Sequence, residues 1–151
     1  MSQRAYRRIL VPIDFSDSSR HALSYALDFA SKLGPARLLL VHAYYVPPEI
    51  EAFAPDRVPG YLGQLSEQAA KDLEKLLTEL QDAQVTAEYL AEPGAPDHVI
   101  TKLAREHDID LIVLSTHGRS GFSRLALGSV AERVVQTAPC PVITLKGPKH
   151  E

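Results

Sequence analysis

The feature that most constrains the fold of this chain is an alternation of short apolar runs with longer amphipathic stretches. Most runs are continuous rather than alternating, as in parallel strands that helices cover on both faces. The run Val85–Leu90 is interrupted by Thr86 and Glu88, so it is expected at an edge of the sheet. The five predicted strands are Ile9–Ile13, Leu38–Ala43, Val85–Leu90, Leu111–Leu114 and Val142–Leu145.

Four helices are predicted between these strands: Asp17–Leu33, Leu62–Leu80, one beginning near Pro96 and one following Gly128. Their apolar stripes should face the sheet. The residues expected to point inward are Ala22, Ala26, Phe29, Ala30 and Leu33; Leu62, Leu65, Ala69, Leu73, Leu76 and Leu80; Val99, Ile100, Leu103, Ala104 and, at the margin, His107; and Val130, Ala131, Val134 and Ala138. The connection Tyr44–Gly60 holds four prolines and no period, which favours a long loop, either a functional lid or a surface excursion.

Strands that alternate with helices in this way imply right-handed crossovers and a doubly wound parallel sheet. The length of 151 residues fits one domain over residues 1–151. In such a sheet the binding crevice lies beyond the carboxyl ends of the strands. The segments to inspect are therefore Ile13–Ser16, Ala43–Tyr45 and Leu114–Gly121.

The composition argues against several classes of protein. The net charge is −3 and no basic stripe is present, so nucleic-acid binding is not expected. No apolar run approaches the roughly 20 residues of a membrane helix, and the polar start lacks a signal-peptide core, so no membrane association is expected. The single cysteine, Cys140, suits a reducing cytoplasm and is expected to be a small buried apolar residue.

The strand Leu111–Leu114 runs into a turn that combines glycines, hydroxyl side chains and an arginine. Glycines let a ligand approach the main chain, and Arg119 suits contact with a phosphate. From this spacing alone a phosphate site and a plain tight turn are about equally supported, because glycine-rich turns after strands are common. The segment is neither a P-loop nor a G-x-G-x-x-G motif. The residues of the turn are Ser115, Thr116, His117, Gly118, Arg119, Ser120 and Gly121.

Gly128 and Ser129 open the last predicted helix, and Ser129 with Glu132 three residues later forms a capping-box pattern. A helix start presents free backbone N–H groups and the positive end of the helix dipole to an anion. Two glycine-bearing turns at one end of one sheet suit a polyphosphate between them. The alternative is that Ser129 only caps its helix.

Asp14 follows the first strand directly. Its carboxylate suits hydrogen bonds to ribose or base, or a metal ion carried by phosphates, and the alternative role is to cap the following turn. Since Ser16 or Asp17 is already a good N-cap for the first helix, Asp14 is expected to be available to a ligand.

No enzymatic constellation is evident in the sequence. The histidines show no metal-ligand spacing, and His42, inside a predicted strand, is expected to be a satisfied sheet residue. No Ser-His-Asp or Cys-His arrangement offers a clear nucleophile, so fast catalysis is not expected and slow nucleotide hydrolysis is left open. A nucleotide-using transferase would need an acid or base beside the phosphates, and only Asp14 and His117 are candidates.

The chain resembles the universal stress protein family along nearly all of its length. The ATP-binding branch of that family carries Gly-x-x-Gly, nine residues, and then Gly-Ser or Gly-Thr. Here Gly118, nine residues and Gly128-Ser129 match, and Ser115 replaces the first glycine. The segments that carry the resemblance are Ile9–Ser16, Leu40–Ala43, Gly94–Pro96, Asp110–Leu114, Gly128–Arg133 and Ala138–Val142.

The resemblance implies an adenine nucleotide alpha hydrolase-like α/β fold, with strand order 3-2-1-4-5 and two helices on each face. It implies a stress-response regulator or sensor that binds ATP, with or without Mg²⁺, and forms a homodimer through the edge strand Val142–Leu145. The alternative is a dimeric interaction module of the same fold without nucleotide, which Ser115 favours. The implied contacts are Pro12, Asp14 and Ala43 around adenine and ribose, and Ser115–Gly121 with Ser129, Val130 and Ala131 around the phosphates.

Overall fold

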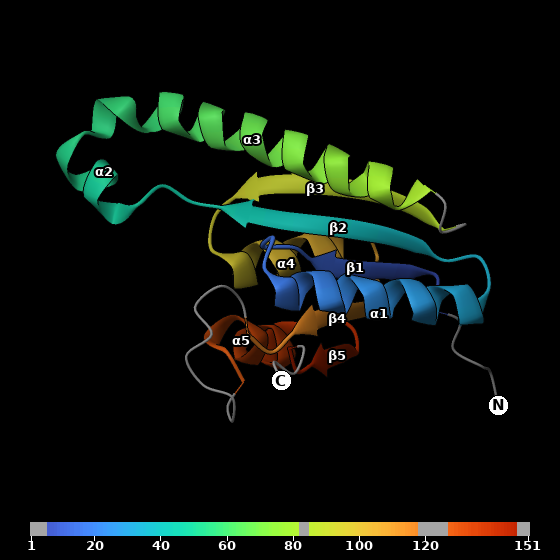
Figure 1. The fold of residues 1–151 in the computed structure, drawn as a ribbon. Coiled ribbons are helices and arrows are strands. Elements are labelled where there is room, and N and C mark those ends of the chain that lie inside the picture. Colours follow the sequence, from blue (N-terminus) through green and yellow to red (C-terminus); the bar gives the residue numbers. More distant parts are fainter. Residues whose placement is uncertain (1–5, 82–84, 118–126, 148–151) are drawn as a thin grey trace.

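A computed structural model describes residues 6–81, 85–117 and 127–147. Within them five parallel strands form one sheet in the order β3-β2-β1-β4-β5 (Figure 1). The predicted fold class, the strand order and the edge position of the third strand are confirmed. The strands are β1 (Arg8–Pro12), β2 (Arg37–Tyr44), β3 (Thr86–Pro93), β4 (Leu111–Ser115) and β5 (Val142–Leu145).

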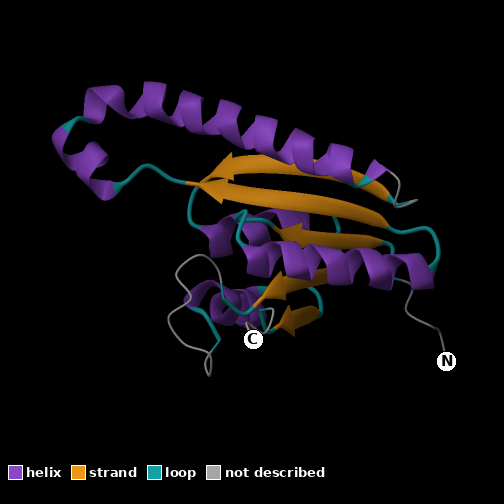
Figure 2. Cartoon of the chain, viewed as in Figure 1, coloured by secondary structure: helices purple, strands orange, loops and turns teal. Residues whose placement is uncertain are grey.

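Helices cover both faces of the sheet (Figure 2). α1 and α3 pack on one face, and α4 and α5 pack on the other. All four predicted helices are present, and α1 has the predicted bounds. The helices are α1 (Asp17–Leu33), α2 (Pro48–Phe53), α3 (Val58–Glu79), α4 (Pro96–Glu106) and α5 (Ser129–Thr137), with a 3-10 turn η1 (Pro55–Arg57).

Strands β1, β2 and β4 contain continuous apolar runs because both of their faces are buried. Successive side chains of a strand point to opposite faces of the sheet. In β1, Ile9 and Val11 belong to the core under α1 and α3, whereas Leu10 belongs to the core under α4 and α5. All three side chains are fully buried, so no position of this stretch is left for a polar residue.

α3 extends beyond the sheet that it covers. Its 22 residues span about 33 Å, whereas the eight residues of β3 span about 27 Å. Figure 1 shows α2 and the first turns of α3 lying past the carboxyl ends of β2 and β3. Within α3 the buried residues are Ala69, Leu73 and Leu76, whereas Leu62 and Leu65, which were predicted to face the core, are only half-buried.

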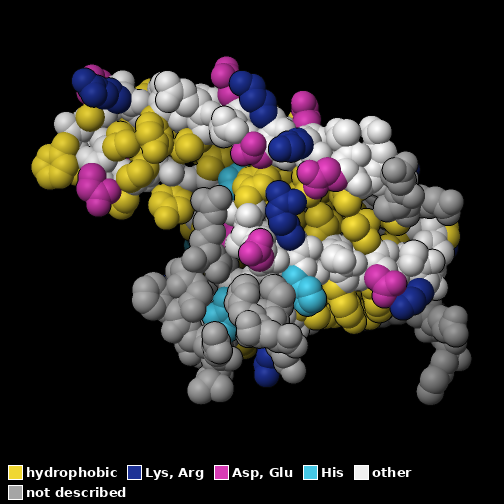
Figure 3. All heavy atoms as spheres, in the orientation of Figure 1, with side chains coloured by type: hydrophobic (Ala, Val, Ile, Leu, Met, Phe, Trp, Pro, Cys, Tyr) yellow, Lys and Arg dark blue, Asp and Glu magenta, His cyan; other side chains and the backbone are white. Residues whose placement is uncertain are grey.

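This projecting part, formed by α2, η1 and the first turns of α3, carries exposed hydrophobic side chains. Figure 3 shows them gathered at the end of the molecule where α2 lies. Phe53 at the end of α2 is 87% exposed, and Tyr45 in the segment that leads to α2 is 63% exposed.

Two other inward predictions are wrong, because Leu33 and His107 lie at or beyond the last turns of α1 and α4 and are exposed.

The prediction that Tyr44–Gly60 is a long loop is wrong, because α2, η1 and the start of α3 lie within it. Pro48, Pro55 and Pro59 each occupy the first or second position of one of these helices. Proline suits such positions, since its fixed φ is helical and its missing N–H would have no partner there. Prolines that suggested an irregular loop therefore mark three successive helix starts.

Candidate functional site

The carboxyl ends of β1 and β4 lie side by side at the centre of the sheet. The chain order reverses between these two strands, since β1 leads to β2 on one side and β4 leads to β5 on the other. This is the position at which sheets of this type bind ligands. The segments after the two strands, Asp14–Ser16 and Thr116–His117, are among those predicted to form the site.

Thr116 connects the end of β4 to two other elements. Its amide nitrogen donates to the carbonyl oxygen of Leu145 at 2.8 Å, and its carbonyl oxygen accepts from the amide of Gly128 at 2.6 Å. Thr116 is also buried. The peptide groups around Thr116 therefore hold the end of β5 and the start of α5 against the end of β4.

Gly128 is required by this close approach. A Cβ atom built on Gly128 would lie 2.5 Å from the carbonyl oxygen of Thr116, closer than a real side chain is ever found. The backbone of Gly128, with φ −61° and ψ 158°, lies in a region open to every residue type. The glycine is thus explained by contact with neighbouring main chain and not by an unusual dihedral angle.

α5 begins without a side-chain cap. Gly128 is the N-cap, and a glycine has no side chain that could accept a hydrogen bond from the first turn. The predicted capping box of Ser129 and Glu132 is wrong, because Ser129 is the first helical residue and the pair stands one position too late. The N–H groups of Ser129, Val130 and Ala131 in the first turn therefore receive no hydrogen bond from an N-cap side chain. Such a helix start suits an anion.

The side chains of the turn after β4 are partly committed to one another. The hydroxyl of Ser115 donates to the carbonyl oxygen of His117 at 3.0 Å, and the hydroxyl of Thr116 lies 2.9 Å from Nδ1 of His117. The other ring nitrogen of His117, Nε2, is buried and has no hydrogen-bond partner among the described residues. Ser115, in the place of a motif glycine, thus contributes to the turn through its side chain.

Asp14 has the turn-capping role that the sequence offered as the alternative. Its Oδ1 accepts hydrogen bonds from both the amide and the hydroxyl of Ser16, the amide at 2.9 Å. Ser16 in turn caps α1 by accepting from the amide of Ser19. We expected that Asp14 would take no part in capping because Ser16 caps α1. This is wrong, because Asp14 accepts hydrogen bonds from the same Ser16 that caps the helix. A ligand role for Asp14 stays a prediction.

Phe15, between Asp14 and Ser16, has a φ of +64°, a conformation that is rare for a bulky residue. Its ring packs against His42, with 4.9 Å between ring centroids. Nδ1 of His42 lies 2.7 Å from the carbonyl oxygen of Ile13, so the prediction of a satisfied sheet histidine is confirmed. These contacts fix the segment after β1 on the face that α1 and α3 cover.

Pro12 and Ala43, the other residues predicted to surround the base and ribose, lie at the same edge of the sheet. Pro12 is the last residue of β1, and Ala43 is the penultimate residue of β2; both are half-buried. Ala43 packs against the core under α4 and α5, on the opposite face from His42. Their contact with a ligand stays a prediction.

Four of the predicted site residues, Gly118, Arg119, Ser120 and Gly121, lie outside the described residues. Their part in phosphate binding therefore stays a prediction from the motif. Among the residues that are described, no group of three or more His, Cys, Asp or Glu side chains is arranged to hold a metal ion. None of the described helices is both long and apolar enough to cross a membrane.

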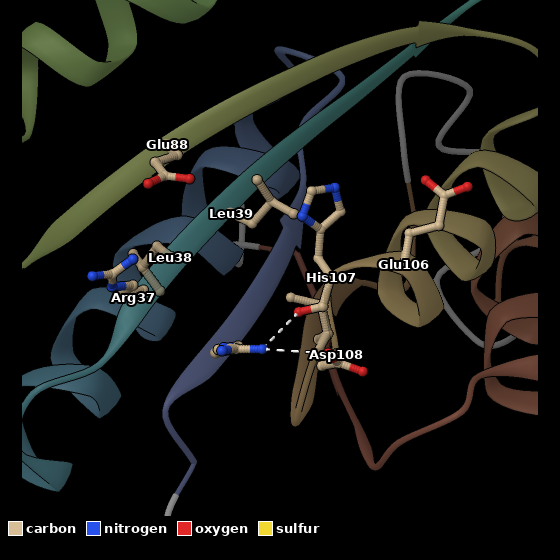
Figure 4. A pocket seen from close by; sticks show the side chains of 9 residues that line it. Arg37, Leu38, Leu39, Glu88, Glu106, His107 and Asp108 are labelled. Atoms are coloured by element: carbon tan, nitrogen blue, oxygen red, sulfur yellow. Dashed lines mark hydrogen bonds and ion pairs between the residues drawn. The ribbon is translucent and has the colours of Figure 1, made fainter.

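A hollow of about 300 Å³ lies at the opposite end of the sheet, where the strands begin (Figure 4). Charged side chains of both signs line it. Nη1 of Arg8 lies 3.6 Å from the Asp108 carboxylate and donates to the carbonyl oxygen of His107 at 3.4 Å. The lining residues are Arg8, Arg37, Leu38, Leu39, Glu88, Glu106, His107, Asp108 and Ile109. They come from β1, β2, β3, α4 and the connection after α4 and form no sequence motif, so the sequence did not predict this hollow.

Two further residues near the starts of the strands have structural roles. Asp110, which precedes β4, accepts from the amides of Arg7 and Arg8 at 2.8 and 2.9 Å and so joins the starts of β4 and β1.

Cys140 is half-buried and packs against the core under α4 and α5. Burial raises the pKa of its thiol, and the charge of Asp110 adds to this effect. A protonated thiol agrees with the predicted packing role.

Comparison with known proteins agrees with this architecture. The sequence pattern of the universal stress protein family matches residues 5–146. Universal stress protein MJ0531 of Methanocaldococcus jannaschii is 32% identical, over 99% of this chain and 87% of that protein.

Two solved structures share the fold. The hypothetical protein MJ0577 of the same archaeon has a TM-score of 0.86 and 28% identity, over 98% of this chain and all of that chain. A universal stress protein in complex with cAMP has a TM-score of 0.68 and 28% identity, over 96% of this chain and all of that chain. The matched family pattern spans nearly the whole sequence, and the strand order is the one that the family resemblance implied. The chain therefore belongs to the universal stress protein family.

Proposed function

We propose that this protein binds ATP at the carboxyl ends of β1 and β4, as a single cytoplasmic domain that acts as a dimeric stress-response regulator or sensor. The observation that carries the proposal is the contact between Gly128 and Thr116. It puts the uncapped start of α5 directly against the end of β4. No fast catalysis is part of the proposal.

The chemistry of this edge suits phosphate groups. An uncapped helix start offers N–H donors and the equivalent of about half a positive charge. Ser129, an exposed residue with a hydroxyl side chain, lies in the same turn. Arg119 and the motif glycines complete the proposed phosphate contacts, and Asp14 is the proposed ligand for a Mg²⁺ ion carried by the phosphates.

An adenine nucleotide is supported by the comparison with solved structures. The relative in complex with cAMP shares 28% identity with this chain and matches it over nearly its whole length. Pro12 and Ala43 form the small, half-buried surface at the ends of β1 and β2 where we place the base. ATP, rather than a monophosphate, is proposed because two turns, one after β4 and one before α5, supply donors for a longer phosphate chain.

The dimer is proposed to form through β5. This strand pairs with β4 on one side, and none of the described strands pairs with its other side. Val142–Leu145 are half-buried and uncharged, and Lys146 follows them. An uncharged open edge favours pairing with a second strand.

The test is the nucleotide content and affinity of the purified full-length protein. Mass spectrometry after mild denaturation should detect a co-purified adenine nucleotide, and calorimetry should detect ATP binding to the emptied protein. Gly118→Val should abolish this binding by blocking approach to the main chain, whereas Gly63→Ala, on the open surface of α3, should leave it unchanged. A protein that carries no nucleotide and binds none contradicts the proposal.

A second candidate function is a dimeric interaction module that holds no nucleotide. Two observations favour it. Ser115 stands in the place of a motif glycine, and its hydroxyl donates to the carbonyl oxygen of His117. Phe53 in the projecting part and Tyr45 in the segment that leads to it are exposed. The same experiment separates the candidates. A protein that is dimeric by sedimentation, and that shows no heat with ATP, ADP or AMP, supports the interaction module.

A further inference from the structure

The segment from Pro47 to Gln68 buries none of its residues, although nearly all of it is helical. By comparison, α4 buries six of its eleven residues. Helices in proteins owe most of their stability to the packing of an apolar face, and α2, with six residues, is too short to be stable by itself. The helices of the projecting part therefore have little of the burial on which such helices depend.

The apolar residues at the start of α3 lie on one stripe of the helix. Val58, Tyr61, Leu62 and Leu65 stand at the spacing of a single helix face and lead to Ala69. All four are half-buried, whereas Ala69 and the later residues of the same stripe are buried. The stripe thus continues past the sheet as a partly uncovered apolar face.

Two aromatic side chains next to this face are more exposed still. Phe53 and Tyr45 are the two most exposed large hydrophobic residues in the described part of the chain. Figure 3 shows hydrophobic side chains gathered at this end of the molecule, with an acidic group beside them. Single exposed hydrophobic residues are common, but a group of them bordered by polar residues is typical of an interaction surface.

The charge of α2 and η1 is mostly negative. Their charged residues are all exposed, and three are acidic and one is basic: Glu49, Glu51, Asp56 and Arg57. Phe53 stands between Glu51 and Asp56 in the sequence. The three acids lie in first helical turns, where they also stabilise the helix start.

This charge discriminates between the possible occupants of the surface. Two copies of the chain that met through α2 would bring like charges together, which disfavours self-association. An anionic membrane surface attracts basic segments and repels acidic ones. A basic protein segment, in contrast, is attracted by the carboxylates and can cover the exposed aromatic rings.

We propose that the projecting part is a docking surface for a protein segment that carries basic side chains around an apolar anchor. Phe53 packs against this anchor, and Glu49, Glu51 and Asp56 attract the basic side chains around it. The inference goes beyond the proposed function, since docking at this surface requires no nucleotide.

The first test selects a random phage-displayed peptide library on the full-length protein, with Phe53→Ser as the counter-selected variant. Enriched peptides should combine basic residues with an aromatic or aliphatic residue. They should bind Phe53→Ser roughly ten- to a hundredfold more weakly, as expected for loss of a buried phenylalanine contact. Leu33→Ser is the matched control, because it removes an exposed apolar side chain at the end of α1 and should leave peptide affinity unchanged.

The electrostatic contribution is tested with the same peptides. Glu51→Gln combined with Asp56→Asn should weaken binding roughly two- to tenfold at low salt and less at high salt. Glu88→Gln combined with Glu106→Gln removes the same charge from exposed residues of the amino-end hollow and should have no effect. Thermal unfolding should be unchanged in Phe53→Ser, because the ring is 87% exposed.

Amide hydrogen exchange locates the bound peptide. Peptide binding should slow exchange in α2 and in the first turns of α3, where the free helices have little apolar burial. Protection confined to another part of the chain overturns the inference.

The remaining outcomes identify other occupants. Enriched peptides that are acidic or uncharged, or a selection that yields no peptide dependent on Phe53, overturn the inference. An oligomer in sedimentation that Phe53→Ser dissociates shows a second copy at this surface, and Phe53-dependent binding to phosphatidylglycerol or phosphatidylcholine vesicles shows a membrane; either result overturns a basic protein partner. Absence of ATP binding overturns the proposed function and leaves this inference standing.

Discussion

The two ends of the sheet are built from different chemical groups. The carboxyl end holds main-chain contacts, short hydroxyl side chains and a buried histidine nitrogen, brought together around Thr116 and Gly128. The amino end holds long charged side chains, such as Arg8, Arg37 and Asp108, around an open hollow. The amino end thus presents exposed charged side chains, whereas the carboxyl end presents groups held by main-chain hydrogen bonds.

This difference indicates which end is suited to a specific ligand. The ion pair between Arg8 and Asp108 is exposed, with 54% and 85% of the two side chains accessible. Water screens such a pair, so it contributes little to stability or specificity. At the carboxyl end the main chain of Thr116 and Gly128 is held by hydrogen bonds, and groups fixed in this way lower the entropic cost of binding a ligand.

The largest effect is expected from Gly128→Ala at the carboxyl end. The new Cβ would meet the Thr116 carbonyl oxygen at 2.5 Å, and the main chain must shift to accept it. We expect a loss of about 2–3 kcal/mol in the free energy of unfolding and loss of ATP binding. Urea denaturation and calorimetry measure the two effects.

The matched control for this variant is Gly63→Ala in α3, where nothing lies within 4 Å of the added Cβ. It should stabilise the helix by about 0.5–1 kcal/mol and leave ATP affinity unchanged. Equal behaviour of the two alanine variants would contradict the view that the Gly128 contact builds the site.

Asp14 is expected to show the next largest effect. Asp14→Ala removes the acceptor for both donors of Ser16 and should lower the free energy of unfolding by about 1–2 kcal/mol. Asp14→Asn keeps an oxygen acceptor but not the charge, so it should retain most of the stability and lose the enhancement of ATP binding by Mg²⁺. Unchanged Mg²⁺ dependence in the asparagine variant would leave Asp14 with the turn role alone.

Ser115→Gly should have a smaller effect. It removes the hydrogen bond to the carbonyl oxygen of His117 and adds backbone freedom, so it should lower the free energy of unfolding by about 0.5–1.5 kcal/mol. ATP affinity should stay equal or increase, because the variant restores the family motif. A large loss of affinity measured by calorimetry would show that the hydroxyl itself contacts the ligand.

The smallest effect is expected at the amino end. Arg37→Ala and Glu88→Gln change exposed side chains of the hollow that lie at the far end of the strands from Thr116. We expect stability within about 0.5 kcal/mol of wild type and an unchanged ATP affinity. A clear loss of nucleotide binding in either variant would contradict the proposed site, because it would indicate that the ligand binds at the amino end of the sheet.

The sheet was predictable because β1, β2 and β4 contain buried apolar runs and each covering helix has an apolar stripe. The start of α1 at Asp17 and its end before Gly34 follow from the residues at the caps, Ser16 and Gly34. Such capping residues can be recognised from the neighbouring sequence alone. The helices in Tyr44–Gly60 were not predictable in the same way, because proline both starts helices and interrupts them.

At the site, the sequence pattern pointed to Thr116 and Gly128 as site residues. It did not show that the main chains of these two residues contact each other. The spacing of Ser129 and Glu132 suggested a cap, whereas the close approach of Thr116 makes Gly128 the N-cap. Such contacts join residues that are distant in sequence, so no local pattern reveals them. The unpaired nitrogen of His117 likewise depends on burial, which a sequence does not contain.

The overhang of α3 has a consequence for the dynamics of the chain. Leu62 and Leu65 are only half-buried, so the first turns of this helix gain less from apolar burial than the turns around the buried Leu73. Segments with little apolar contact unfold locally at a lower free energy than the global transition. Amide protons in the first turns of α3 and in α2 should therefore exchange with solvent sooner than those near Leu73, while the sheet stays intact.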